Sequence, residues 1–379
     1  MDYEAMGPNA RLALDTIRQK HGVGIPSWII HPMEHRMIDR LAGMPEGSYA
    51  QDPARVYLAM QRNAGTCMID QYIPDNPLTI GDHGYRSSTP RTATTGAEQI
   101  VLNGMTIDSP ERVVEHLERF GFPAIEKTMR DFNADAHAAA IIKRERETQE
   151  ILGPDILKGG YAYISFPYLY YSTYGYVNYF MAYALYPEVI EKHFRLQADL
   201  AVLKNKAAAR AYREGDLAPI YRLDHDMADS RGTLVDIKSL DRLWFPHFAR
   251  SIAPLLETDM RLIWHCDGNL MAMVPRLIEA GVSGFQGFQY EAGMDYERIC
   301  RMKDRWGRDL IIIGGVSVTR TLPHGTPTDV RREIKWLVEK GPRVGLFLGI
   351  SSSITPGVPF ENLQAMVEGF KYYRAHGRD

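Results

Sequence analysis

Residues 262–269 contain the side chains with the clearest chemical potential in this sequence. They read Leu-Ile-Trp-His-Cys-Asp-Gly-Asn, an apolar run that ends in His265, Cys266 and Asp267. Because side chains alternate along a β-strand, His265 and Asp267 are predicted to share one face, while Cys266 points the other way into the packing and is not expected to act as a nucleophile. An imidazole and a carboxylate on one face can bind Zn²⁺, or the carboxylate can orient the imidazole without a metal.

A catalytic zinc site usually has three protein ligands, so a third one is needed beside His265 and Asp267. Asp226, Glu291 and His35 are the candidates, and spacing alone fixes none of them. Two interpretations of this site therefore stay open. In one, His265 and Asp267 bind zinc; in the other, they form a His–Asp pair without a metal. In either case His265, Asp267 and Asp226 are the predicted catalytic residues.

Further polar residues follow other predicted strands and are expected to bind substrate. His31 and His35 would share a helical face if a helix followed His31. A run of tyrosines suggests a partly polar cavity, although tyrosines also form packed layers with satisfied hydroxyls. Aspartates in loops can likewise serve only to cap a turn. The predicted substrate-binding residues are His31, His35, Asp70, Tyr168, Tyr170, Tyr174, Asp224, Gln289 and Ser352.

Alternating strands and helices are predicted to hold these residues in place. Short β-branched runs alternate with amphipathic stretches, which is typical of βα units around a parallel sheet. In α/β barrels the reactive groups gather at the carboxyl ends of the strands. The chain is therefore predicted to be an α/β protein, a (β/α)8 TIM barrel with strands at residues 26–31, 66–72, 161–166, 218–223, 261–265, 282–288, 310–314 and 344–349.

The helices add an amino-terminal element and a long insertion to this plan. Residues 9–20 are predicted to form a helix capped by Asn9, and residues 327–340 form the clearest helix, with Thr326 as its N-cap. A helix over residues 362–376 would complete the outer ring of helices around the barrel. Residues from about 76 to 160 read as an insertion after the second strand, helical from Ser109 and again from Ala134. The whole chain, residues 1–379, is predicted to be one domain.

Composition narrows the classes of partner. The net charge of −3 gives no basic field for nucleic acid or a membrane surface, and no apolar run approaches the length of a spanning helix. The polar, acidic beginning of the sequence does not read as a signal peptide. Three cysteines far apart indicate a reducing compartment, so a cytoplasmic location is expected.

A succession of short motifs resembles the uroporphyrinogen decarboxylase-like superfamily. The resemblance runs from about residue 9 to the end and is most specific in the carboxyl half. It implies a TIM barrel with its active site at the strand ends. The motifs that carry it are Pro26-x-Trp28, residues 223–227, His265-x-Asp267-Gly268, residues 277–282, Gln289, residues 313–316 and residues 352–362.

The decarboxylase branch of that superfamily binds a tetrapyrrole with many carboxylates through an arginine-rich motif. Aligned on Pro26 and Trp28, the two arginine positions fall on His31 and His35. The family's carboxyl-terminal histidine is replaced by Ser352, although Asp70 matches its acidic residue. Without the two guanidiniums the chain lacks the forked donors that suit a polycarboxylate, so porphyrinogen decarboxylation is not expected.

The other branch consists of methyltransferases that pass a methyl group to the cobalt of a corrinoid protein. Its thiol-dependent members hold zinc with His-x-Cys and a later Cys, whereas this sequence has His265, Asp267 and, near the later position, Ser352. The sequence thus resembles the members that demethylate methoxylated aromatics or methylamines. The resemblance implies a corrinoid (cobalamin) acceptor on a partner protein and a small methyl donor, and the cluster of His265 and Asp267 could act on that donor with or without a zinc ion.

Two further functions stay open. One is a decarboxylase-like lyase that acts on a carboxylated substrate. The other is a barrel without enzymatic activity that binds a small ligand or a tetrapyrrole. The many charged residues at the predicted strand ends weigh against the second, because pockets that only bind are mostly apolar.

Overall fold

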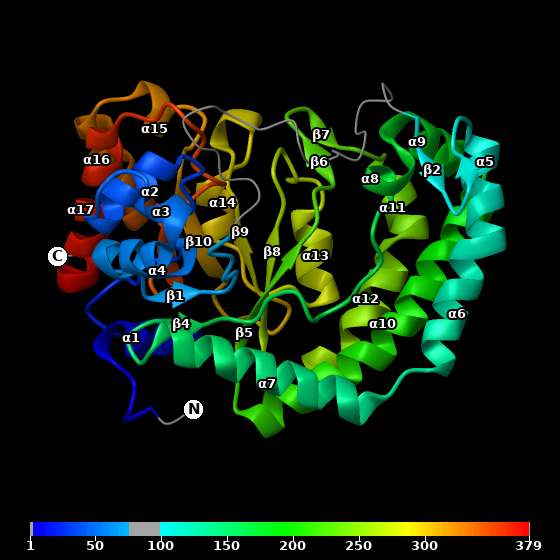
Figure 1. Ribbon diagram of the computed structural model, residues 1–379, viewed down its shortest axis with the longest axis horizontal. Coiled ribbons are helices and arrows are strands. Elements are labelled where there is room, and N and C mark those ends of the chain that lie inside the picture. The colour runs from blue at the N-terminus through cyan, green and yellow to red at the C-terminus, as the bar shows by residue number, and fades with distance from the viewer. Residues whose placement is uncertain (1–2, 76–98, 379) are drawn as a thin grey trace.

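The computed structural model describes residues 3–75 and 99–378, and a parallel sheet lies at its centre (Figure 1). Its five strands follow the order β11-β10-β9-β8-β5, and every neighbouring pair is parallel. These strands are β5 (Ile220–Asp224), β8 (Arg261–His265), β9 (Gly284–Gln286), β10 (Ile311–Val316) and β11 (Leu346–Ile350). They are almost wholly buried, as expected for parallel strands covered by helices.

The amino-terminal part contributes shorter strands to the same arrangement. β1 (Met68–Ile69) pairs in parallel with β4 (Leu157–Lys158). Single parallel bridges join Ser27 to Leu348 of β11, Trp28 to Met68 of β1, and Gly160 to Tyr221 of β5. Parallel pairing thus connects residues 27–28, β1, β4, β5, β8, β9, β10 and β11 in that order, which gives a TIM-barrel-like α/β fold.

The predicted strands agree with the observed strands to different degrees. The five predicted strands of the carboxyl half overlap β5, β8, β9, β10 and β11, and residues 261–265 coincide with β8. The predicted strand over residues 161–166 is wrong, because the pairing lies at β4 and Gly160 instead. The backbone N–H groups of Tyr163 and Ile164 donate to the hydroxyl of Tyr221 at 2.8 and 2.9 Å. A side chain therefore takes the donors that a strand would use.

Helices cover the sheet, and several begin as the sequence predicts. α16 (Pro327–Lys340) starts at a capping box in which Thr326 and Asp329 bond to each other's backbone. α17 (Phe360–His376) follows, and α1 (Pro8–Ile17) precedes the first paired segment. The N-cap of α1 is Gly7, so the prediction of Asn9 is wrong. Asn9 lies inside the helix, where it cannot act as the N-cap. Its side-chain amide instead donates to Asp155 at 3.0 Å.

Between β1 and β4, the part of the predicted insertion that the structure describes is mostly helical. Residues 76–98 of that insertion lie outside the described residues. Figure 1 shows α7 running along the lower edge of the molecule. The elements here are β2 (Val101–Leu102), β3 (Met105–Thr106), α5 (Pro110–His116), a π-helical turn (Leu117–Gly121), α6 (Phe122–Arg130) and α7 (Ala134–Leu152).

The remaining elements join the paired strands. Before β1 come α2 (His35–Ala42), α3 (Ser48–Gln51) and α4 (Pro53–Ala64). After β4 come α8 (Tyr171–Tyr174), α9 (Tyr176–Leu185) and α10 (Pro187–Gly215). Later connections hold β6 (Ala228–Asp229), β7 (Gly232–Thr233), α11 (Ile237–Leu243), α12 (Phe245–Leu256), α13 (Val274–Ala280), a 3₁₀ turn (Tyr290–Ala292), α14 (Tyr296–Cys300) and α15 (Thr321–His324). No helix among the described residues is long and apolar enough to cross a membrane.

Candidate active site

Asp226, His265 and Asp267 meet where β5 and β8 end. Each offers one atom that could bind a metal, and these atoms all lie within 4.8 Å of one another. β5 and β8 are neighbours, with Asp224 opposite His265, so the loop after β5 brings Asp226 next to the end of β8. The structure thus places together the three residues that the sequence predicts to be catalytic, and it selects Asp226 among the candidates for a third ligand. Their catalytic role stays a prediction.

Two atoms of this cluster have no protein partner. Nδ1 of His265 and Oδ1 of Asp267 are buried, and no hydrogen-bond partner for either lies among the residues that the structure describes. The other carboxylate oxygen of Asp267 accepts from the Ser352 hydroxyl at 3.2 Å. The backbone N–H of Asp267 donates to Oδ1 of Asp226 at 3.0 Å. Buried polar atoms are nearly always paired, so the two open atoms are available for a metal or a substrate.

The cluster is also electrostatically unusual. Burial raises the pKa of Asp267; the negative charge of Asp226 adds to this effect, whereas His265 opposes it. Asp267 therefore holds a proton more readily than an exposed aspartate does. Such a carboxyl can donate a proton, and a bound cation would displace that proton and bind the carboxylate instead.

Gly287 makes room for the imidazole of His265. Its φ of +84° lies in the left-handed region, and a Cβ at this position would lie 2.6 Å from Nδ1 of His265. A larger residue would therefore suffer both backbone strain and a steric clash. Gly287 is not among the residues predicted from the sequence, although the repeat Gly-Phe-Gln-Gly-Phe-Gln over residues 284–289 is a visible signal of a tight strand exit.

A second charged group lies beside this cluster and centres on Arg222, which is also absent from the predicted site residues. Arg222 is buried in β5 and donates to Asp70 at 2.5 Å and to Asp224 at 3.0 Å. The other oxygen of Asp70 accepts from the Trp28 indole at 3.1 Å and from the Gln71 backbone at 2.8 Å. The sequence does contain a signal of this group, namely a single arginine inside an apolar strand. A buried guanidinium must be paired, so such an arginine predicts carboxylates beside it.

Asp70 and Asp224 are therefore engaged by the protein itself. Burial works against ionisation of Asp224, but His265, Arg222 and the Tyr161 hydroxyl together lower its pKa. The Tyr161 hydroxyl donates to Asp224 at 3.0 Å. Direct binding of substrate by Asp70 stays a prediction, and such a contact would compete with its existing donors.

His31 and His35 do not share a helical face, so that prediction is wrong. α2 begins at His35, whereas His31 precedes Pro32, which bridges to Ile354. A residue before proline is driven from the helical region to the extended one, which explains the difference. Burial lowers the pKa of His31 to about 4, so its imidazole is neutral. The ring of His35 packs edge-on against Tyr49 at 4.8 Å.

The predicted tyrosines have different surroundings. Tyr168 lies 4.7 Å from the ring of His225, and Tyr170 lies 4.7 Å from the ring of His193. The hydroxyl of Tyr174 is 3.0 Å from Nδ1 of His116, an arrangement typical of a packed layer with satisfied hydroxyls. Tyr171, which lies in the same run, donates its hydroxyl to the backbone oxygen of Asp226 at 2.8 Å. Of this run, Tyr171 therefore contacts the cluster directly.

The other predicted residues support the loops around the cluster. The Gln289 side chain accepts from the Gly268 backbone at 2.9 Å, and Ser352 contacts Asp267 as described above. Cys266 is buried and accepts from the Met227 backbone at 3.3 Å. Burial raises the pKa of the Cys266 thiol to about 12, which keeps it protonated and unreactive. Glu291 accepts from Ser317 at 3.4 Å and is not part of the cluster.

Known proteins resemble this chain in part of its sequence and in its fold. Residues 225–373 match the family model described as "Uroporphyrinogen decarboxylase (URO-D)". A "methyltransferase from Methanosarcina mazei" aligns with 96% of this chain and 98% of its own, with 15% identity and a TM-score of 0.57. A B12-independent methionine synthase from Shewanella sp. W3-18-1 aligns with 61% of this chain and 67% of its own, with 13% identity and a TM-score of 0.39. No curated protein matches the sequence.

The family model covers β8 and the loops that carry the three cluster residues, but not β5. It begins one residue before Asp226 and extends into α17. The resemblance to the uroporphyrinogen decarboxylase-like superfamily is thereby confirmed for this segment, and the Methanosarcina structure shares the fold over nearly the whole chain.

Proposed function

We propose that this chain is a methyltransferase that moves a methyl group from a small donor to the Co(I) of a corrinoid protein. The observation that carries the proposal is the cluster of Asp226, His265 and Asp267, with two buried atoms left open at the carboxyl ends of β5 and β8. Strand ends of this kind hold the active sites of TIM barrels. The donor class is a methoxylated aromatic or a methylamine-like compound.

The residues of the cluster fit a zinc ion. His265, Asp267 and Asp226 would hold it, because Zn²⁺ accepts imidazole nitrogen and carboxylate oxygen, and their ligand atoms lie within 4.8 Å of one another. Bound there, zinc would act as a Lewis acid on the oxygen or nitrogen that loses the methyl group. Ser352 keeps one carboxylate oxygen of Asp267 in place and leaves Oδ1 open.

Methyl transfer to Co(I) requires help for the leaving atom. The cobalt supplies the electron pair of the new bond to carbon, and the old carbon–oxygen or carbon–nitrogen bond breaks with its pair on the heteroatom. A phenolate or an amine leaves poorly unless it is protonated or polarised. In the absence of a metal, Asp267 could supply the proton instead, because its pKa is raised and its Oδ1 is open toward that heteroatom.

The aromatic side chains beside the cluster suit the proposed donors. The ring of Tyr171 stacks on His225 at 5.9 Å, and Tyr168 packs against the same imidazole. Burial lowers the pKa of His225 to about 3, so this group of rings is uncharged. Aromatic faces of this kind favour a flat methoxylated ring or, through cation–π contact, a methylated ammonium group.

The charges around Arg222 weigh against the lyase alternative. A decarboxylase acting on a carboxylated substrate needs a guanidinium that can bind the substrate. Arg222 is buried, and Asp70 and Asp224 both pair with it, so its charge is already compensated. At the two positions where the decarboxylases have arginines, the chain has His31 and His35.

The proposal is tested by mixing the purified protein with Co(I) cobalamin, or with a Co(I) corrinoid protein, and a panel of methyl donors. We expect at least one methoxylated aromatic or methylamine to replace the Co(I) absorption spectrum with that of methylated cobalt. We expect uroporphyrinogen to stay unchanged under the same conditions. Decarboxylation of the porphyrinogen, with Co(I) left intact by every donor, would contradict the proposal.

A further inference from the structure

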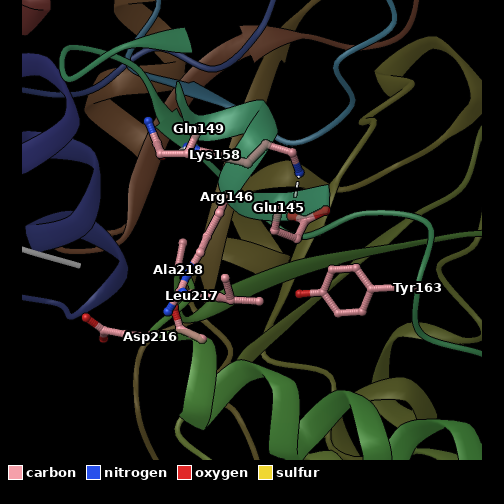
Figure 2. Close-up of a pocket in the computed structure, with 10 residues that line it drawn as sticks. Glu145, Arg146, Gln149, Lys158, Tyr163, Asp216, Leu217 and Ala218 are labelled. Carbon is pink, nitrogen blue, oxygen red and sulfur yellow. Dashed lines mark hydrogen bonds and ion pairs between the residues drawn. The ribbon is translucent and has the colours of Figure 1, made fainter. Parts of the chain in front are cut away.

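Figure 2 shows a separate cavity of about 300 Å³. It lies at the opposite end of β5 from the cluster of Asp226, His265 and Asp267. α7, β4 and the loop between α10 and β5 form its walls. Leu217 and Ala218 of that loop precede β5, whereas Asp226 follows it. Five residues of extended strand span roughly 16 Å, so the cavity and the cluster are distinct sites.

One end of the cavity holds a buried ion pair. Nζ of Lys158 lies 2.8 Å from Oε2 of Glu145, and the two side chains are only 6% and 5% exposed. The ammonium also donates to the backbone oxygen of Gly159. An ammonium has three N–H donors, so one remains after these two bonds. The pair leaves no net charge at this end of the cavity.

The hydroxyl of Tyr163 lies in the same cavity and has no partner. Tyr163 is 6% exposed, and among residues 3–75 and 99–378 no group forms a hydrogen bond with its hydroxyl. Its ring packs edge-on against Tyr221 at 4.7 Å, and its backbone N–H donates to the Tyr221 hydroxyl. Figure 2 shows the hydroxyl pointing toward the other labelled residues. A buried hydroxyl without a partner costs about 1–3 kcal/mol, so an acceptor from a ligand would stabilise it.

The rest of the cavity wall combines apolar and polar residues. Leu217, Ala218 and two glycines contribute to it, together with Arg146, Gln149 and Asp216. At Gly160, a Cβ would lie 2.5 Å from the Tyr163 hydroxyl, so the missing side chain keeps the space beside that hydroxyl clear. Apolar wall residues with placed polar groups among them are characteristic of small-molecule sites.

We propose that this cavity is a second ligand site, for a small uncharged molecule with an apolar body and one carbonyl oxygen. The carbonyl accepts from the Tyr163 hydroxyl and from the third N–H of Lys158, and the body packs against Leu217 and Ala218. An anionic ligand is disfavoured, because the charges that line the cavity balance: Glu145 neutralises Lys158, and Asp216 lies on the same wall as Arg146. The site does not depend on the proposed methyl transfer.

The probe for this site is 4-fluoroacetophenone, titrated into the full-length protein and followed by fluorine NMR. We expect saturable binding with a Kd of about 1 mM or tighter, as a ligand of this size allows. Tyr163→Phe removes the donated hydrogen bond and should weaken binding about tenfold. Tyr179→Phe is the matched control, because Tyr179 is a buried tyrosine of α9 outside the cavity lining, and it should bind like the unaltered protein.

Leu217→Trp provides a second variant, since the indole should fill the cavity and abolish binding. Thermal unfolding of each variant shows that it is folded. The proposal is overturned if the unaltered protein shows no saturable binding, which would leave only water in the cavity. Equal binding by Tyr163→Phe, or tighter binding of 4-fluorobenzoate than of the ketone, would also overturn it.

Discussion

Two groups of carboxylates lie near the ends of the paired strands and differ in how their oxygens are used. In the first, Asp70 and Asp224 surround the buried Arg222, and the oxygens of Asp70 accept from Arg222, Trp28 and the Gln71 backbone. In the second, Asp226 and Asp267 lie beside His265, and Oδ1 of Asp267 and Nδ1 of His265 are open.

This difference separates a group that stabilises the fold from one that is available for chemistry. Pairing with the Arg222 guanidinium occupies the carboxylate oxygens and compensates their negative charge, so few free acceptor atoms remain to bind a ligand. Buried atoms without partners are energetically costly, and a ligand or an ion that pairs with them removes that cost. The comparison predicts that changes in the first group affect mainly stability, whereas changes in the second affect mainly activity.

The largest expected effect is on stability, from Asp70→Asn. The change leaves Arg222 buried with only one carboxylate, and breaking such a pair typically costs about 3–5 kcal/mol. We expect the free energy of unfolding, measured by urea titration, to fall by about this amount. The control is Asp75→Asn, because Asp75 is exposed and its replacement should change the value by no more than about 0.5 kcal/mol. Equal effects of the two changes would contradict the structural role of the Arg222 group.

His265→Ala tests the second group. The change removes a metal ligand or the partner of the proton donor, and we expect methyl transfer to slow by at least about 10²-fold. Cys266→Ala is the neighbouring control, because its thiol is buried and protonated, and it should change the rate little. The rate of cobalt methylation is the measurement. If Cys266→Ala abolished transfer while His265→Ala spared it, the assignment of the active site would be wrong.

His193 provides a test outside the two groups of carboxylates. Its Nδ1 is also buried without a partner among the described residues, and His193 does not belong to the cluster. Burial lowers the pKa of His193 to about 4. The unfolded chain therefore binds a proton near pH 6.5 that the folded chain does not, so the stabilisation present above pH 6.5 is lost toward pH 4.

His193→Gln removes this titration. Between pH 7 and pH 5, the free energy of unfolding of the unaltered protein should fall by about 2 kcal/mol more than that of the variant. Urea titration at the two pH values measures this difference. If both proteins lose the same stability, His193 is not held neutral by the fold.

The smallest expected effect is that of Ser352→Ala. Its hydroxyl donates one hydrogen bond to Asp267, and a bond of this kind contributes about 0.5–1.5 kcal/mol. We expect methyl transfer to slow by about 2- to 10-fold, measured as for His265→Ala, with little loss of stability. A loss as large as that of His265→Ala would mean that Ser352 itself contacts the reacting groups.

Local sequence was enough to predict the carboxyl half of the sheet and the proximity of His265 and Asp267. β8 is an apolar run that ends in polar residues, so its bounds and the shared face of His265 and Asp267 follow from alternation. Asp226 joins them because β5 and β8 are neighbours, which a barrel order implies.

Contacts between distant parts of the chain were not predictable in this way. Asp70 and Arg222 are 152 positions apart, so the sequence gives no direct sign that the acid is paired. Residues 161–166 have the composition of a strand, but hydroxyl and amide groups of Tyr221 and Asn205 bind their backbone instead. The separation of His31 from the helix at His35 was visible in principle, because Pro32 follows His31.

Metal analysis tests the central claim, that the open atoms of the Asp226 cluster form a reactive metal site. Protein purified without chelator should contain about one zinc per chain, and His265→Ala should contain much less. Asp70→Asn, if folded, should keep its zinc, because Asp70 belongs to the other group. Metal-free protein that transfers methyl groups at the full rate would contradict the claim.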